Sequence, residues 1–339
     1  MKIIVTADTH YDIWDYSGRL LLEAQREFLS DVDMLIVAGD LTNNPERNWK
    51  ACLEWLCTFL PAEKIWVMPG NHDYYGFRLD GDPQLQAIAE SVGVNFAQKS
   101  VIEADGVRFL LCTLWTDMQL LGTLDQSKAF MMRGMNDYHM IRVPTDLSRM
   151  RLAMPDDTIL VHKEHLAWLD AELARPFDGR TVVVTHHCPH PAATGVVDNF
   201  TAGFTSDLSW IIEKHAPEAW LFGHTHRHLR ATVGRTEVRN ISLGYPREVG
   251  PGVEGSLLLR GIVDTETDSL LAPLFSDHAS IIRESPSGIR FVVFNDIPDT
   301  LKGPFDSYLL GSTCPVVDGF MDAAYATDWI GFCQRYGVA

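Results

Sequence analysis

Short apolar runs rich in β-branched residues recur along the chain, and each ends in glycine or polar residues. Runs of this length are typical of strands that are buried on both faces. The strands expected from them are residues 3–6, 34–38, 65–68, 109–113, 181–185 and 219–222. Segments with helical spacing of apolar residues lie between several of them, at residues 20–29, 49–60, 85–92, 163–174 and 206–214. This alternation predicts an α/β fold.

Two regions interrupt the alternation. Residues 115–157 are a methionine-rich, mixed stretch, which we interpret as an insertion that serves either as a lid or as surface packing. Residues 264–269 have the composition of a polar linker. We therefore expect a main domain of residues 1–263 and a small C-terminal extension of residues 266–339.

The extension has a pattern of its own. A hairpin is expected at residues 280–284 and 289–294, and a closing helix at residues 319–336. Residues 266–339 contain four basic and ten acidic side chains, which argues against nucleic-acid binding. Formation of a homo-oligomer, or capping of a sheet edge, is the role we expect for this segment.

Composition narrows the class of protein. The chain has 339 residues, of which 46% are hydrophobic and 22% charged, so it can form a large core. Its formal net charge of -17, without any run of Lys or Arg, disfavours nucleic acid as a partner. The six cysteines are scattered, as is usual for reduced thiols. No export signal or apolar run of transmembrane length is visible, so we predict a cytoplasmic protein without a membrane span.

Polar motifs follow five of the expected strands. They are Asp8-Thr9-His10, Gly39-Asp40, Gly70-Asn71-His72-Asp73, His186-His187 and Gly223-His224-Thr225-His226. One such motif alone usually indicates turn chemistry. Five in order are different, because open α/β sheets place ligands beyond the carboxyl ends of their strands. They predict a shared metal site, and carboxylate, carboxamide and imidazole ligands suit Mn, Fe or Zn.

Taken together, the motifs closely resemble the calcineurin-like metallophosphoesterase superfamily, whose pattern is D-x-H, G-D, G-N-H-D/E, H and G-H-x-H. The resemblance covers residues 1–263, and the metal order is similar to that of the cyclic-nucleotide phosphodiesterase branch. It implies a four-layer sandwich of two mixed β-sheets flanked by helices. It also implies a hydrolase of phosphate esters that uses a metal-bound hydroxide and two divalent or trivalent metal ions.

Carried over residue by residue, the resemblance implies seven metal ligands and one catalytic residue. The ligands are Asp8, His10 and His226 for one metal ion, Asn71, His186 and His224 for the other, and Asp40 as the bridge between them. His72 is similar to the family's catalytic histidine, which lies close to the scissile phosphate. An imidazole in that place can donate a proton to the departing oxygen.

Three further residues are candidates for substrate contact, each with a structural alternative. Asn43 could touch phosphate, although an asparagine close to a proline is also good turn chemistry. His187 is the second histidine of its pair and could instead pack behind the ligands. Tyr138 lies in the insertion, where core packing is equally expected. For Arg227, directly after the last motif, we favour a structural or surface role.

The leading hypothesis is a small-substrate phosphodiesterase or phosphatase. A nuclease is the second hypothesis, but the chain has no basic stripe to hold a long polyanion. A non-catalytic scaffold of the same fold is the third, and such a protein would be expected to have lost ligands that this chain retains.

Overall fold

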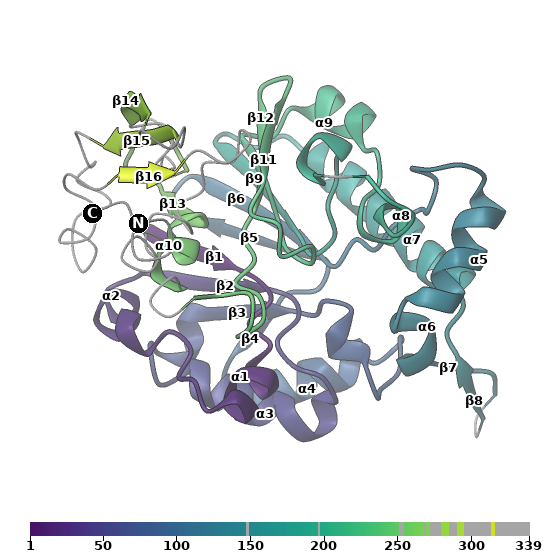
Figure 1. The fold of residues 1–339 in the computed structure, drawn as a ribbon. Helices are drawn as coiled ribbons and strands as arrows, with labels where there is room; N and C mark the ends of the chain where they lie inside the picture. Colours follow the sequence, from purple (N-terminus) through teal and green to yellow (C-terminus); the bar gives the residue numbers. More distant parts are fainter. Residues whose placement is uncertain are drawn as a thin grey trace.

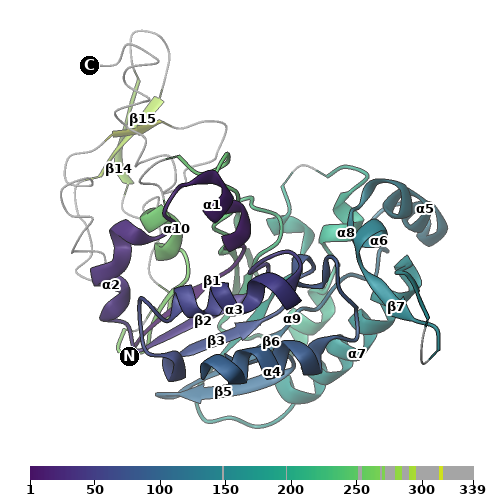
Figure 2. The same cartoon turned by 90° about the horizontal axis from the view of Figure 1, so that it is seen from below.

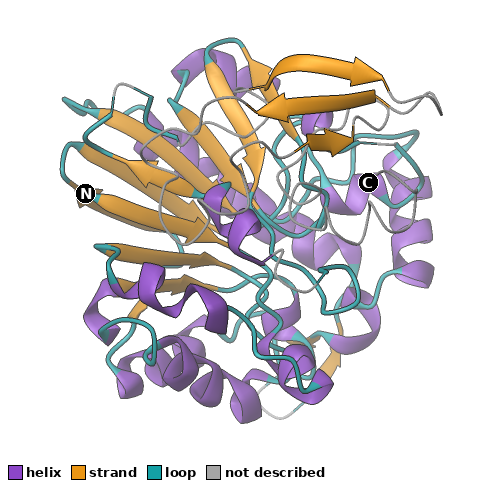
Figure 3. Ribbon diagram, turned by 60° about the vertical axis from the view of Figure 1, so that its left-hand side comes forward, coloured by secondary structure: helices purple, strands orange, loops and turns teal. Residues whose placement is uncertain are grey.

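Two β-sheets form the centre of the molecule, and helices cover their outer faces (Figures 1 and 3). The computed structural model describes residues 1–146, 149–195, 197–250, 254–267 and 269–271, and the backbone of three strands beyond them. The strand order is β13-β1-β2-β3-β4 in the first sheet and β11-β12-β10-β9-β6-β5 in the second.

The first sheet is parallel except at one edge, where β13 pairs antiparallel with β1. Its strands are β1 (Lys2–Thr6), β2 (Met34–Ala38), β3 (Ile65–Met68), β4 (Asn95–Phe96) and β13 (Ile262–Asp264). In the second sheet β6, β9, β10 and β12 are parallel, and β5 and β11 are antiparallel edges. Its strands are β5 (Ser100–Ala104), β6 (Val107–Cys112), β9 (Arg180–Thr185), β10 (Ala219–Phe222), β11 (Arg230–Val233) and β12 (Thr236–Asn240).

Alternating side chains build three layers of core. In β1, Ile4 packs with the helices outside the first sheet, whereas Ile3 and Val5 pack in the cluster between the two sheets. In the second sheet, Phe109 faces this middle layer and Leu110 faces the outer helices. Successive strand residues point to opposite faces, so buried runs without polar residues are what a sandwiched sheet requires.

The outer helices supply the remaining layers. Helices that contribute to the core outside the first sheet include α1 (Tyr11–Ser17), α3 (Pro45–Leu56), α4 (Asp82–Val92) and α10 (Glu254–Leu259). Figure 2 shows α3 and α4 across its strands. Outside the second sheet lie α7 (Pro155–Leu173) and α9 (Ser209–His215). The α/β class, with two mixed sheets flanked by helices, is therefore confirmed.

The insertion expected at residues 115–157 folds into its own small elements at one end of the molecule (Figure 1). These are α5 (Leu124–Gly134), α6 (Asp137–Met140) and the hairpin of β7 (Arg142–Pro144) and β8 (Met150–Leu152). Helix α5 contacts α6, α7 and the short helix α8 (Thr201–Phe204). The expected end at residue 157 falls inside α7, because Pro155 begins that helix.

Two other expectations need correction. Residues 20–29 are not one helix but a 3-10 turn (Glu23–Gln25) followed by α2 (Arg26–Ser30), because Leu22 adopts a left-handed conformation with φ 60°. The expected linker at 264–269 begins inside β13, and Leu270 and Leu271 directly after it are 1% and 5% exposed. These two leucines belong to the core between the sheets.

The C-terminal hairpin is present as β14 (Ala279–Glu284) and β15 (Arg290–Phe294), which pair antiparallel, and β15 also pairs with β16 (Thr313–Pro315). The closing helix expected at residues 319–336 lies outside the described residues. Short 3-10 turns at Ala62–Lys64, His72–Tyr74 and Pro191–Ala193 complete the secondary structure. Within the ranges given above, no helix has both the length and the apolar character needed to cross a membrane.

Candidate metal centre

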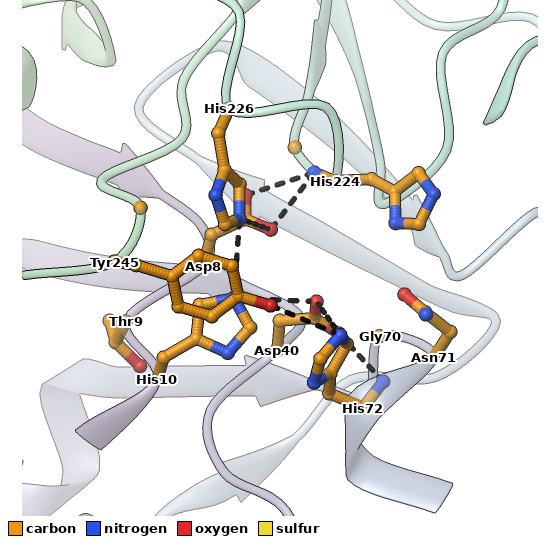
Figure 4. A network of polar contacts seen from close by, with 12 residues as sticks. Asp8, Thr9, His10, Asp40, Gly70, Asn71, His72, His224, His226 and Tyr245 are labelled. Atoms are coloured by element: carbon orange, nitrogen blue, oxygen red, sulfur yellow. Dashed lines mark hydrogen bonds and ion pairs between the residues drawn. The ribbon is translucent and has the colours of Figure 1, made fainter. Parts of the chain in front are cut away.

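The five polar motifs meet at one edge of the sandwich, where β1, β2 and β3 of one sheet and β9 and β10 of the other end. Figure 4 shows residues of the motifs that follow β1, β2, β3 and β10. Their nitrogen and oxygen atoms form three overlapping groups in which all donor atoms lie within 4.8 Å of one another. The groups are Asp8, His10 and His226, then His10, Asp40 and His72, and then Asp40, His186 and His224.

The first group is built around Asp8, which is fully buried. Nε2 of His226 lies 3.1 Å from Oδ1 of Asp8 and 3.2 Å from Nε2 of His10. Burial lowers the pKa of His10 well below its ordinary value, so this ring is neutral and offers a lone pair. Burial opposes a charge on His226, but Asp8 and Glu248 raise its pKa to about 10. A bound metal ion would take the place of that proton.

The third group holds a histidine, His224, whose ring nitrogens are not satisfied by hydrogen bonds. Both ring nitrogens of His224 are shielded from solvent and have no hydrogen-bond partner. Burial lowers the pKa of His224 well below its ordinary value, so protonation of the ring does not make up for the missing hydrogen bonds. Next to it, Nε2 of His186 lies 3.0 Å from Oδ1 of Asn71 and 3.2 Å from Oδ1 of Asp40. Buried polar atoms without partners are rare in native proteins, and a cation bound here would explain these two. The residues present therefore fit a metal ion.

Asp40 belongs to the third group, also faces His10 of the first group, and is 1% exposed. Its Oδ1 faces His186, and its Oδ2 lies 3.7 Å from Nε2 of His10 and 3.9 Å from Nε2 of His72. Burial opposes ionisation of this carboxyl, yet His186, His72 and His10 together hold its pKa well below the usual value. An ionised carboxylate with one oxygen toward each group has the geometry of a bridge.

The backbone at the site is strained. Among the seven expected ligands, five have a positive φ: Asp8 at 59°, His10 at 38°, Asp40 at 54°, His224 at 66° and His226 at 49°. Such conformations are uncommon for residues other than glycine and persist only where the surrounding structure imposes them. They turn each side chain sharply at the end of its strand, toward the same point.

The glycines of the motifs are required by close approach. A Cβ on Gly70 would lie within 3.0 Å of Oδ1 of Asp40 and of the ring of His186. A Cβ on Gly223 would lie 2.6 Å from Oδ2 of Asp8. Real Cβ atoms do not approach other atoms this closely, so larger residues would displace candidate ligands.

His72 is held by the loop after β2. Its Nδ1 lies 2.9 Å from Oδ1 of Asn43, while Nδ2 of Asn43 donates to Oδ2 of Asp12 at 3.1 Å. Because this amide points its nitrogen at Asp12, its oxygen accepts from Nδ1 of His72. Nε2 of His72 is then the atom that faces Asp40 and the pocket. In this structure Asn43 contacts His72, and it does not line the pocket.

The other two residues expected to contact substrate are buried. The hydroxyl of Tyr138 lies 3.0 Å from Oγ1 of Thr158, and the ring of His187 stacks on Trp115 with Nδ1 3.1 Å from the carbonyl of Thr113. Neither side chain lines the pocket over the site. Packing, the alternative that was open for both, is the arrangement found here.

Two functional positions in the loop after β12 were missed from the sequence. Oε2 of Glu248 lies 2.7 Å from Nδ1 of His226. The ring of Tyr245 stacks on His10 with centroids 4.3 Å apart, and its hydroxyl lies 3.4 Å from Nε2 of His72 (Figure 4). Both residues follow the last motif by about twenty positions, and no spacing connects them with it. Tyr245 and Glu248 lie at the site because β12 leads the chain back to this edge of the sandwich.

A third missed position is Asp73, whose motif was noted without a role for it. Its buried carboxylate accepts the backbone N–H groups of Leu41, Thr42 and Gly70 at 2.8 to 3.2 Å. It also accepts the indole N–H of Trp49 at 2.7 Å. Burial and the charge of Asp40 raise the pKa of Asp73 to about 7, against the effect of these donors. Asp73 thus ties the loop that carries Asp40 to the loop that carries Asn71.

An open pocket of about 390 Å³ lies over the site. One side consists of candidate ligands and His72, and Tyr245 and Glu248 lie beside them. Met135 and Asn136 from the insertion also line the pocket, as do Phe200, Phe204 and Arg227. The pocket has the size of a small-molecule site.

Comparison with known proteins agrees with this geometry. The family model described as calcineurin-like phosphoesterase matches residues 1–228. The uncharacterized protein L509 of Acanthamoeba polyphaga mimivirus is 25% identical over 272 residues, which cover 73% of this chain and 93% of that protein. The 3',5'-cyclic adenosine monophosphate phosphodiesterase CpdA of Escherichia coli K12 is 23% identical over 243 residues, covering 68% and 70%.

Among solved structures, the phosphopantetheinyl hydrolase PptH of Mycobacterium tuberculosis has a TM-score of 0.53 and 18% identity, covering 73% of this chain and 90% of that one. At such identity the likeness shows the fold, and function must be argued from the site. The family model, in contrast, spans all five motifs and two thirds of the chain. This chain therefore belongs to the calcineurin-like phosphoesterase family.

Proposed function

We propose that this chain is a two-metal hydrolase of small phosphate esters, either a phosphodiesterase or a phosphatase. The observation that carries the proposal is the position of Asp40 between two groups of nitrogen and oxygen donors. The buried, unpartnered nitrogens of His224 and the strained backbone of five expected ligands support it. Neither the unpartnered nitrogens nor the strained backbone is expected in a non-catalytic scaffold.

The residues that would hold the metal ions are those assigned above, with Asp40 shared by both. Carboxylate, carboxamide and imidazole donors suit Mn, Fe or Zn. When bound, two such cations lower the pKa of a water molecule and offset the negative charge of the phosphate oxygens. The chain's own part is to fix these donors and to exclude water around them, which the burial of Asp8, His10 and Asp40 achieves.

His72 is the residue that we assign to proton transfer. Oδ1 of Asn43 accepts from Nδ1, so the proton that can be given to the departing alcohol oxygen is the one that Nε2 carries when both ring nitrogens are protonated. The hydroxyl of Tyr245 is close to the same nitrogen and can orient it or the ester oxygen. In the hydrolysis, water supplies the oxygen that joins phosphorus, the ester P–O bond breaks, and the alcohol leaves with one proton.

The preference for small esters rests on size and charge. The pocket of about 390 Å³ holds a small organic phosphate, and a net charge of -17 disfavours a long polyanion. The relative CpdA is named a phosphodiesterase of a small cyclic nucleotide, which supports a diester as substrate. A nuclease is the second candidate function, because the family resemblance alone does not exclude it.

A kinetic panel tests the proposal. Chelator-treated protein, with and without added Mn²⁺, is assayed on cyclic nucleotides, glycerophosphodiesters, dinucleotides, monoesters and nucleic acids. We expect Mn²⁺-dependent turnover of at least one small ester. Protein that binds Mn²⁺ but turns over no ester would contradict the proposal, and faster cleavage of DNA or RNA than of small diesters would favour the nuclease.

A further inference from the structure

Three apolar side chains from outside the five motifs line the pocket together with candidate ligands. We name Met135, Phe200 and Phe204 the apolar wall. Met135 lies directly after α5, Phe204 is the last residue of α8, and Phe200 directly precedes that helix. All three line the same pocket as Asp40 and His224.

The wall begins one ring away from the candidate metal centre. The ring of Phe204 meets that of His224 edge to face, with centroids 5.0 Å apart. The ring of Phe200 is nearly parallel to that of Phe204, at an angle of 10° and a centroid distance of 6.4 Å. On its far side Phe130 of α5 packs against Phe200 at 4.8 Å. A row of rings therefore leads from His224 out to the insertion.

Close packing fixes this wall in place. A Cβ on Gly134 would lie 2.7 Å from the ring of Phe200, and a Cβ on Gly203 would lie 2.5 Å from Sδ of Met135. Helices α5 and α8 can approach this closely only because both positions are glycine. Phe200 and Phe204 nevertheless keep part of their surface exposed, in the pocket that also contains candidate ligands.

We propose that the apolar wall binds the organic part of the substrate, and that this part carries an aromatic ring. The inference rests on the proposed function, because it assumes that the phosphate binds at the candidate metal centre. A phosphate there places its ester substituent within reach of Phe204. A ring in that position removes apolar surface from water on both partners and can contact the phenylalanines edge to face or offset.

The test compares two anions that differ only in their apolar part. Binding of phenylphosphonate and methylphosphonate to the Mn²⁺-loaded protein is measured by calorimetry. We expect the wild type to bind phenylphosphonate about 10-fold more tightly. In Phe200→Ala this preference should disappear while the affinity for methylphosphonate is unchanged. Phe177→Ala is the matched control, since Phe177 packs beside Arg108 away from the pocket and should keep the preference.

Phe200→Leu is a second variant that preserves folding better, because it keeps an apolar side chain against Phe130. It removes the ring, so it should lose most of the preference for phenylphosphonate over methylphosphonate. Equal affinity of the wild type for both phosphonates, or an equal loss for both in the Phe200 variants, would overturn the inference. Turnover of an ester by protein that binds neither phosphonate would also overturn the inference. Each of these outcomes leaves Mn²⁺-dependent ester hydrolysis standing, whereas failure of the proposed function would appear as absence of that hydrolysis.

Discussion

Strained conformations and unsatisfied atoms coincide at the candidate ligands. A left-handed backbone costs on the order of 1–3 kcal/mol for a residue other than glycine, and five expected ligands adopt it. His10 and His224 also hold ring nitrogens that no donor or acceptor reaches. These features reduce stability without a cation and are compensated when one binds, which is how a functional site differs from a well-satisfied core.

At His72, proton transfer can be separated from metal binding. His72→Ala should retain both metal ions yet lose about 10²–10⁴-fold in turnover of esters whose leaving group is a poorly stabilised alkoxide. A nitrophenyl ester needs little protonation, so its turnover should fall much less. The two ester types are compared in steady-state kinetics, with metal content and melting temperature as controls. Similar losses on both would reject proton donation by His72.

Glu248 is predicted to position His226. The carboxylate accepts from Nδ1 of His226 and so directs Nε2 toward Asp8. Removing such a partner commonly weakens metal binding about 10–100-fold, so Glu248→Ala should do so, and Glu248→Gln should lose less because it still accepts a hydrogen bond. Titration against a competing chelator measures the affinity. The exposed Glu213→Ala is the control, and an unchanged affinity in Glu248→Ala would show that His226 needs no such support.

The residues of the site were predictable to different degrees. Asp8, Asp40 and His224 stand in short motifs directly after strands, so their convergence followed from the topology of an α/β sheet. Glu248 and Tyr245 reach the site through a long return of the chain, and nothing in their local sequence indicates it. The burial of Tyr138 and His187 depends on packing partners distant in sequence, which a pattern of residue types cannot show.

Among the elements, the loops after β2 and β3 are tied together by Asp73. Asp73→Ala would leave three backbone N–H groups and the indole N–H of Trp49 buried without an acceptor. Each of these four groups costs about 1–3 kcal/mol, so the free energy of unfolding should fall by at least about 4 kcal/mol. Urea denaturation measures it, with the exposed Asp31→Ala as control. A change within about 0.5 kcal/mol, as for ordinary surface residues, would contradict this role.

The core strands were predicted well because short, wholly apolar runs bounded by polar residues are what a strand buried on both faces requires. The six expected strands are all present; three have the expected ends, and the other three differ by one or two residues at an end. The region 20–29 was predicted less well, since its helical spacing is interrupted at Leu22, whose positive φ is imposed by the surrounding structure. The linker was predicted wrongly because the residues up to 269 are mostly polar, and this composition does not indicate that the two leucines that follow are buried.

At the scale of the whole molecule, the chain directly after β13 still contacts the two sheets. Leu270 and Leu271 are buried between the sheets, and Arg180 donates to the carbonyls of Thr265 and Thr267. Burial of a leucine contributes about 1.5–3 kcal/mol. A chain that ends at Asp264 should therefore be less stable to urea than one that ends at Leu271, by at least about 3 kcal/mol. Equal stability would mean that this segment is only an appendage.

The division into a main domain and an extension that forms a homo-oligomer stays a prediction. Light scattering on the chain that ends at Leu271, compared with the full chain, addresses it directly. The same pair of chains, assayed for ester turnover, shows whether residues after Leu271 bear on the site.

The central claim is that two metal ions share one carboxylate at the edge of the sandwich. Elemental analysis of the wild type and of Asp40→Asn, after equilibration with Mn²⁺ and removal of free metal, tests it most directly. We predict two ions per chain in the wild type and loss of both in the variant, because a neutral carboxamide cannot balance charge at two cations. The exposed Asp31→Asn should bind as the wild type does. Loss of only one ion in Asp40→Asn, with the other bound as before, would contradict the shared carboxylate.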